Sequence, residues 1–365
     1  MQTGFSRSPR PGRALPAAFL WAGALVACGA GASDGGAEAG WTEVASLPAP
    51  TSNNAVAAVS SGERDQLFSF MGLDTTRLYA GVHARAFRYD MKADRWREVN
   101  GPGTPRLAGT AQSVRGRIYL FGGYTVAADG SEASMPDVDI FDPETEHWSS
   151  GAPIPVPADD AVSGVWRDSL IFLISGWHDR DNVANVQLYD PFTDSWRQAT
   201  PIPGPPAFGH AGAIAGDAIV YIDGVRTAAE QPRFRMARAS YIGRIDPTDP
   251  TQIAWAELPP HPGPPLYRAA AGALGSRVVF AGGATNPYNY DGIGYDGAPS
   301  EPVDIVFAYD VIAGAWESLP AKPLASMDHR GFAVAGGRLF IVGGMLEDRR
   351  VTDRVQVLEL ENGSR

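Results

Sequence analysis

The chain has 365 residues, of which 44% are hydrophobic and 19% charged, and its formal net charge is −11 at pH 7. This composition excludes a disordered chain, because enough apolar side chain is present to bury a core. The negative charge would repel a polyanion, so we expect no nucleic-acid partner. The 42 Gly and 30 Pro are spread along the chain, which is typical of many short strands joined by tight turns.

The first segment, residues 1–27, has the pattern of an export signal. A basic region is followed by an apolar run of eleven residues, Ala17 to Ala27, too short for a membrane span of about 20 residues. The run ends in Leu25-Val26-Ala27-Cys28, which resembles the bacterial lipobox, in which the signal is cut before a cysteine that is then acylated. The basic residues are Arg7, Arg10 and Arg13.

Cys28 is the only cysteine in the chain, which agrees with a thiol kept for lipidation and allows no disulfide. We therefore predict a lipoprotein of the cell envelope, facing the periplasm or the cell exterior and attached to the membrane only through Cys28. Ordinary secretion, with cleavage after a small residue near Ala32, is the alternative. Residues 28–40 are rich in Gly and Ala and are predicted to form a flexible tether.

From residue 41 to about 362 the sequence is repetitive, with one tryptophan in each unit. Each Trp follows an aromatic or apolar residue, an Asp and a turn, and precedes a Pro-rich segment, as in Phe141-Asp142-Pro143 before Trp148 and Pro153-Ile154-Pro155 after it. The intervals between tryptophans are 48 to 61 residues, which predicts a repeat protein. The six residues are Trp41, Trp96, Trp148, Trp196, Trp255 and Trp316.

A strongly apolar segment in each unit ends in a glycine pair or a degenerate form of one. An almost continuously apolar strand is expected where sheets pack on both of its faces, and the glycines allow unusual backbone angles at its end. Each unit therefore predicts four short antiparallel strands. The six pairs are Met71-Gly72, Gly122-Gly123, Ser175-Gly176, Asp223-Gly224, Gly282-Gly283 and Gly343-Gly344.

These motifs resemble kelch repeats over essentially residues 41–360. The resemblance implies an all-β fold, a six-bladed kelch-type β-propeller of the galactose oxidase-like superfamily, in which each unit is one blade. The chain begins on a Trp strand without a partner and ends after three strands without a final Trp. We therefore expect the N-terminal strand to complete the last blade and leave no free edge.

Polar residues gather in the connections that lead into the innermost strands and in the loops that follow the glycine pairs, which should emerge on one face. In an acidic protein, arginines there would suit a carboxylate or phosphate, and Tyr and Asn would suit a sugar. Structural arginines paired with blade-edge acids are the alternative. The candidate ligand-binding residues are Asn54, Arg106, His210, Arg238, Arg268, Tyr290 and Arg330.

The sequence gives little support for a metal site, a paired-carboxylate catalytic site or a copper-radical site. The six histidines never fall at zinc-ligand spacing, and the segment from Trp177 to Asn182 lacks the spacing of a calcium loop, so we expect no metal and no cofactor. Asp159 and Asp160 could form an acid/base pair, but adjacent strand residues point to opposite faces, so we expect turn residues. The radical site of the galactose oxidase-like copper enzymes needs a cysteine, and Cys28 lies in the export region.

The chain is also similar to the periplasmic six-bladed kelch mutarotases that act on N-acetylneuraminate. The likeness includes export, N-terminal closure, a Tyr/Asn-rich loop after the fifth glycine pair, and Arg238 before the fourth-blade Asp246. It implies an arginine with a nearby glutamate, but the glutamate position holds Val225, and Glu230 replaces it only if the loop shifts.

We therefore predict an exported propeller that binds a small acidic sugar or an envelope protein partner. The alternative is a sialic-acid mutarotase or epimerase, in which Arg238, helped by Arg268 or Arg330, holds the carboxylate. Glu230 or His210 would then move the protons.

Overall fold

The computed structural model describes residues 40–61 and 64–360, and all of them lie in one compact unit. The predicted signal (1–27), its Cys28 and most of the predicted tether (28–40) lie outside the described residues. Among those described, two short 3₁₀ turns are the only helical segments, η1 (Tyr79–Gly81) and η2 (Glu347–Arg349), and none could cross a membrane. The rest of the regular structure is β-strand.

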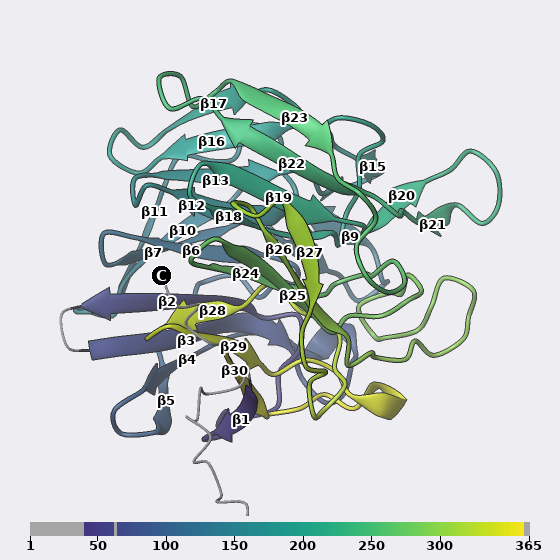
Figure 1. Ribbon diagram of the computed structural model, residues 1–365. Helices are drawn as coiled ribbons and strands as arrows, with labels where there is room; N and C mark the ends of the chain where they lie inside the picture. The colour runs from purple at the N-terminus through teal and green to yellow at the C-terminus, as the bar shows by residue number, and fades with distance from the viewer. Residues whose placement is uncertain (1–39, 62–63, 361–365) are drawn as a thin grey trace, which may run out of the picture. The chain divides into compact units, whose positions relative to one another are not determined.

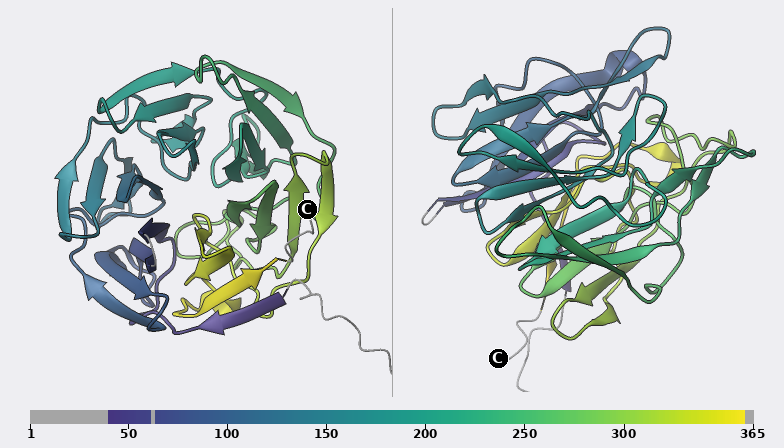
Figure 2. Two further views of the ribbon diagram at one scale, coloured as in Figure 1. Left: turned by 60° about the vertical axis from the view of Figure 1, so that its left-hand side comes forward. Right: turned by 90° about the horizontal axis from the view of Figure 1, so that it is seen from above.

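Six four-stranded antiparallel sheets are arranged around one axis, which confirms the predicted six-bladed propeller (Figure 1; Figure 2, left). The first three blades, from the inside outwards, are β2 (Ala55–Ser61), β3 (Arg64–Leu73), β4 (Val82–Asp90) and β5 (Arg95–Val99); β6 (Thr110–Val114), β7 (Arg117–Phe121), β10 (Val138–Asp142) and β11 (His147–Ser150); and β12 (Val162–Trp166), β13 (Leu170–Ile174), β16 (Val186–Asp190) and β17 (Ser195–Ala199).

The other three blades are β18 (Ala211–Ala215), β19 (Ala218–Ile222), β22 (Ser240–Ile245) and β23 (Ile253–Glu257); β24 (Ala270–Leu274), β25 (Arg277–Ala281), β26 (Val306–Asp310) and β27 (Ala315–Ser318); and β28 (Ala333–Ala335), β29 (Arg338–Val342), β30 (Val355–Glu359) and β1 (Gly40–Val44). Neighbouring innermost strands contact one another in a closed circle, from β2 through β28 and back to β2.

The N-terminal strand closes the ring, as predicted. β1 pairs antiparallel with β30, so that Trp41 lies opposite Leu358 at the outer edge of the sixth blade. Figure 2 (left) shows this purple strand beside the yellow ones. The Trp41 Nε1–H donates a hydrogen bond of 3.0 Å to the carbonyl oxygen of Pro320, in the fifth-blade segment. The pairing leaves no free sheet edge at the junction between chain ends.

Every repeat tryptophan donates its indole N–H to a backbone carbonyl in the preceding unit. The donor–acceptor distances lie between 2.8 and 3.3 Å. Each Trp therefore fills space between blades and fixes their spacing through one hydrogen bond. This recurring bond explains why one Trp per unit is the most regular feature of the sequence.

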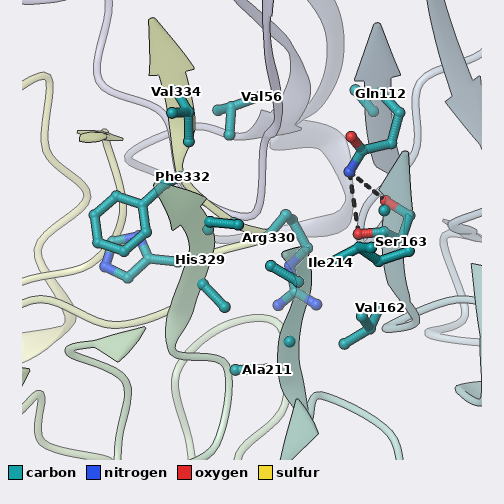
Figure 3. A pocket seen from close by; sticks show the side chains of 18 of the residues that line it. Val56, Gln112, Val162, Ser163, Ala211, Ile214, His329, Arg330, Phe332 and Val334 are labelled. Carbon is teal, nitrogen blue, oxygen red and sulfur yellow. Dashed lines mark hydrogen bonds between the residues drawn. The ribbon is translucent and has the colours of Figure 1, made fainter. Parts of the chain in front are cut away.

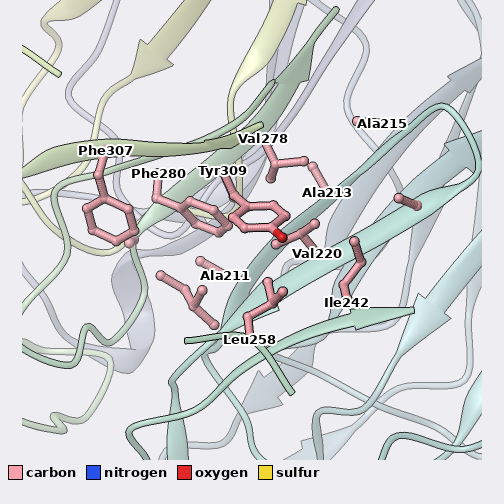
Figure 4. Close-up of a cluster of buried hydrophobic side chains, with 14 of the residues drawn as sticks. Ala211, Ala213, Ala215, Val220, Ile242, Leu258, Val278, Phe280, Phe307 and Tyr309 are labelled. Atoms are coloured by element: carbon pink, nitrogen blue, oxygen red, sulfur yellow. The ribbon is translucent and has the colours of Figure 1, made fainter. Parts of the chain in front are cut away.

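Apolar side chains from adjacent blades interlock between the sheets. Between the fourth and fifth blades, Val220 of β19 packs with Phe280 of β25 and Tyr309 of β26 (Figure 4). All five residues of β19 are buried, because blades cover both faces of this strand.

The second member of each glycine pair cannot carry a side chain. All six have a φ between +81° and +127°. In every blade, a Cβ at this position would lie 2.8 Å or less from a carbonyl oxygen in the connection that leads into the innermost strand. For Gly224, the distance to the carbonyl oxygen of Phe208 would be 2.7 Å. The first member tolerates Met71, Ser175 or Asp223, which explains why the motif is degenerate at that position only.

Candidate ligand pocket on the loop face

One face of the propeller carries both sets of connections that the sequence singled out, and we call it the loop face. There, the residue after each glycine pair forms a β-bridge with the connection into the innermost strand, as between Tyr124 and Leu107 or Trp177 and Asp159. Three short hairpins extend this face (Figure 1). They are β8 (Tyr124–Val126) with β9 (Glu132–Ser134), β14 (Trp177–His178) with β15 (Asp181–Asn182), and β20 (Val225–Thr227) with β21 (Phe234–Met236).

Six residues, one from each blade, meet at the axis just below the loop face, and we call them the axial ring. All six have a left-handed backbone, with φ between 49° and 69°. Backbone hydrogen bonds link neighbours around the axis, including Gly209 N–H to Asp160 O at 2.9 Å and Arg268 N–H to Gly209 O at 2.8 Å. The axial ring consists of Asn53, Ala108, Asp160, Gly209, Arg268 and Asp328.

A buried charge cluster fills the centre of the axial ring. The Arg268 guanidinium donates to both carboxylate oxygens of Asp160, at 3.0 and 2.6 Å, and to Asp328 Oδ1 at 3.2 Å. Arg330 donates to the same two carboxylates from the channel side. The side chains of both arginines and both aspartates are at most 4% exposed, so two positive and two negative charges balance each other away from water.

Beneath the axial ring, the channel between the innermost strands encloses a cavity of about 220 Å³ (Figure 3). Most of its lining is small and apolar, such as Val56, Ala211 and Ile214, and the Arg330 side chain lies among these residues. His210 also lines it, and both of its ring nitrogens lack a hydrogen-bond partner among the described residues. Burial lowers the pKa of His210 to about 4, so this imidazole is neutral near pH 7.

Above the axial ring lies a second cavity, of about 350 Å³, that opens to solvent between the hairpins. We call it the loop-face pocket. Its volume falls within the range of small-molecule sites, and it combines aromatic walls with a few polar groups. It is lined by Tyr124, Gly130, Glu132, Asp159, Asp160, Trp177, Asp179, Phe208, Phe234, Arg268, Asn289 and Tyr295.

The aromatic side chains of the pocket form one continuous wall. The Trp177 and Phe208 ring centres are 5.3 Å apart, and those of Phe234 and Tyr295 are 4.2 Å apart. Phe234 also lies 5.7 Å from Trp177. These residues come from the third, fourth and fifth repeats, so the wall forms only when these three neighbouring blades pack together.

The polar side of the pocket is acidic. Asp159, 2% exposed, accepts a hydrogen bond of 2.5 Å from the Ser134 hydroxyl, and Asp179 accepts one of 3.0 Å from the Ser134 N–H. Burial raises the pKa of Asp159 to about 7. Desolvation by the surrounding loops also raises the pKa of Glu132. Among the described residues, no Lys or Arg forms an ion pair with Glu132, Asp159 or Asp179.

Two of the sequence-predicted site residues reach the axis as ion-paired groups. Arg268 lines the loop-face pocket and Arg330 lines the channel, and both are bonded to Asp160 and Asp328. His210 also lines the channel, below the axial ring. These three residues therefore lie on two different sides of the ring and do not share one pocket.

The remaining predicted residues are not among those that line either cavity. Asn54 is buried and donates to Ser69 Oγ at 2.8 Å. Arg106, 1% exposed, donates to the Gly122 carbonyl at 2.7 Å and pairs with Asp139 at 2.5 Å, which is a structural role. Tyr290 is half-buried and packs against the apolar layer of the loop face.

Arg238 and Glu230, which the mutarotase resemblance singled out, are exposed and lie outside the loop-face pocket. The Arg238 guanidinium donates to the Gly263 carbonyl at 3.2 Å, toward the fifth blade. The Arg235 guanidinium donates to three carbonyls of its own loop, including that of Glu230 at 3.3 Å. Arg235 and Arg238 therefore do not point into the pocket.

Asp159 and Asp160 lie in the connection before the innermost strand β12 and not within that strand, which agrees with the prediction that they are turn residues. The φ of +49° at Asp160 interrupts the alternation of a strand, so both residues line the loop-face pocket.

The fold and these recurring contacts define a six-bladed β-propeller in which each blade has one tryptophan and one glycine pair or its degenerate form. A family model described as "Kelch motif" matches residues 105–155. The chain is therefore a six-bladed β-propeller of the kelch type that contains a kelch motif at residues 105–155, as the sequence motifs predicted.

The proteins similar to this chain include one curated protein and one solved structure. The Kelch-like protein terF of Aspergillus terreus (strain NIH 2624 / FGSC A1156) is 31% identical over 137 residues, which cover 36% of this chain and 29% of that protein. The chain thus matches less than a third of this curated relative's length. A solved structure titled "Structure of YjhT" superposes with a TM-score of 0.71 at 17% identity, covering 88% of this chain and 98% of that one. At this identity the likeness shows the fold.

Proposed function

We propose that this protein is a binding module that takes a small organic ligand into the loop-face pocket. The observation that carries the proposal is the pocket itself, a cavity of about 350 Å³ with a continuous aromatic wall, an acidic side and a closed floor. The charge cluster of the axial ring forms the floor, so a ligand would be held at the mouth and would not pass into the channel.

The predicted acidic sugar is not the ligand class that this pocket favours. Arg268 is the one arginine or lysine among its lining residues, and that guanidinium already binds two carboxylates. A ligand carboxylate would approach Glu132 and Asp179 without a free counter-charge. A sugar-sized ligand agrees with the aromatic wall, but a negative charge on it does not agree with the acidic side.

The test is thermal unfolding of the full chain with a panel of small sugars, amino sugars and amines. A ligand that binds only the folded state at a hundredfold excess over its Kd stabilises it by about 2.7 kcal/mol. We expect the shift to disappear in Trp177→Ala and to persist in Phe192→Ala, whose side chain is 86% exposed and does not line the pocket. Equal shifts in both variants would mean that the ligand binds elsewhere.

A second candidate function, isomerisation of a sugar, is favoured by one observation. The pKa of Asp159, raised to about 7 by burial, suits a group that takes up and releases a proton near neutral pH. Anomer exchange of a bound aldose, followed by polarimetry, would then accelerate with wild type and not with Asp159→Asn. Binding without acceleration would leave the binding module as the function.

A further inference from the structure

We propose that the ligand of the loop-face pocket is an organic cation, with a protonated amine or quaternary ammonium group. This inference rests on the proposed function, because it names the ligand class of the same pocket. Three features of the described residues support it: the charge balance of the lining, the arrangement of the aromatic wall, and a cation of the protein itself that already lies against that wall.

The charge balance leaves a negative pocket. Asp160 is neutralised by Arg268 and Arg330 in the floor. The carboxylates of Glu132, Asp159 and Asp179 remain, without an ion pair to any described Lys or Arg. Asp159 is buried, whereas Glu132 and Asp179 are exposed at the mouth of the pocket. A carboxylate at the buried position attracts a cation more strongly than the same group would in open water, and the two exposed carboxylates add to the negative potential at the mouth.

Asp159 marks the depth at which the positive charge would lie. Its side chain is 2% exposed, belongs to the lining, and has its Oδ2 occupied by the Ser134 hydroxyl. Burial raises its pKa to about 7, because the loss of hydration outweighs the Ser134 hydrogen bond and the more distant charges of Arg268 and Arg330. An ammonium group in contact with Asp159 would stabilise its carboxylate form.

The aromatic wall complements the carboxylates. Trp177, Phe234 and Tyr295 all line the pocket, and rings of this kind attract a cation near their faces. Tyr295 stacks 4.2 Å from Phe234. The Arg233 guanidinium already lies 5.7 Å from the Trp177 ring centre and 5.3 Å from that of Phe234. Arg233 is exposed and is not one of the lining residues, so it competes with a ligand cation for these rings from outside the cavity.

The test is isothermal titration calorimetry of the full chain with four probes. D-glucosamine and N-acetyl-D-glucosamine share one ring and differ in the charge of the nitrogen, choline is a cation without a sugar, and N-acetylneuraminate is an acidic sugar. We expect D-glucosamine and choline to bind and D-glucosamine to bind at least tenfold more tightly than its N-acetyl form.

Variants then locate the charge effect. Glu132→Gln and Asp179→Asn should each weaken the binding of D-glucosamine about fivefold to tenfold. The matched control Glu257→Gln, on the exposed outer strand β23, removes the same charge away from the pocket and should leave affinity unchanged within about twofold. Arg233→Gln should strengthen binding, because it removes the competing cation from the rim.

The outcomes separate this inference from the proposed function. Equal affinity for D-glucosamine and N-acetyl-D-glucosamine, or binding of N-acetylneuraminate alone, overturns the inference that the ligand is a cation. If the observed binding is then lost in Trp177→Ala, the loop-face pocket is still the binding site and the proposed function stands. Cation binding that Glu132→Gln and Asp179→Asn leave unchanged also overturns the inference. The absence of binding by any of the four probes overturns the inference and argues against the proposed function as well.

Discussion

The closed floor of the pocket depends on Arg268, and Arg268→Met should be strongly destabilising. The side chain is 3% exposed and makes three hydrogen bonds to Asp160 and Asp328, which are themselves at most 3% exposed. Its loss leaves one positive charge, on Arg330, for two buried carboxylates. Removing one partner of a buried ion pair costs about 3–5 kcal/mol, because the remaining charge is uncompensated.

The corresponding shift in Tm follows from the entropy of unfolding. At about 2.1 cal/mol/K per residue, a propeller of roughly 320 residues has an unfolding entropy of about 0.7 kcal/mol/K. The expected decrease in Tm is therefore about 4–7 °C, measured by differential scanning calorimetry or near-UV circular dichroism. The double variant Arg268→Met/Asp328→Asn removes one charge of each sign, so it should be less destabilised than the sum of its single variants.

Arg85→Met is the matched control. Arg85 also donates two hydrogen bonds to one carboxylate, that of Glu98, at 3.0 and 3.2 Å, but the two side chains are 41% and 53% exposed. An exposed pair contributes at most about 1 kcal/mol, so the Tm should fall by less than about 2 °C. If Arg268→Met lowers the Tm no more than Arg85→Met does, the charge cluster does not hold the floor together.

Two further predictions concern the blades. Gly224→Ala should destabilise the fold by more than about 2 kcal/mol, because the new Cβ would lie 2.7 Å from the Phe208 carbonyl oxygen at a φ of +81°. The control Gly216→Ala, whose Cβ would have no atom within 4 Å, should cost about 1 kcal/mol. Urea unfolding measures both free energies. Burial lowers the pKa of Lys322 from 10.5 to about 7, so the unfolded chain binds more protons between these values and stability rises with pH across that window. Lys322→Met should remove this rise, and an unchanged slope in urea titrations from pH 7 to pH 10 would contradict the assignment.

The architecture was predictable from the sequence because each blade repeats the same physical requirements. The Trp recurs because its indole N–H bonds the preceding unit, and the second glycine of each pair recurs because a Cβ would strike a carbonyl oxygen. Closure was predictable from the unpaired strand at Trp41. These requirements recur once in every repeat, so single residue types at regular intervals reveal them.

The pocket was only partly predictable, because its residues are brought together by irregular connections. The sequence pointed to the loop face and to Arg268, which lines the pocket, but a pattern of arginines could not show that Asp160 and Asp328 already neutralise two of them. The aromatic wall comes from separate repeats, and Phe234 lies in a hairpin of no regular motif. One signal was available: the aromatic residues Tyr124 and Trp177 directly follow glycine pairs, where the chain returns to the axis.

The most direct test of the account is a crystal structure of the full chain soaked with D-glucosamine. We expect ligand density in the loop-face pocket, with the ring against Trp177 and Phe234 and the charged nitrogen within hydrogen-bond distance of Asp159 or Glu132. Density in the channel below the axial ring, or on the opposite face of the propeller, would contradict it, as would a pocket left empty at a D-glucosamine concentration well above the Kd measured in solution.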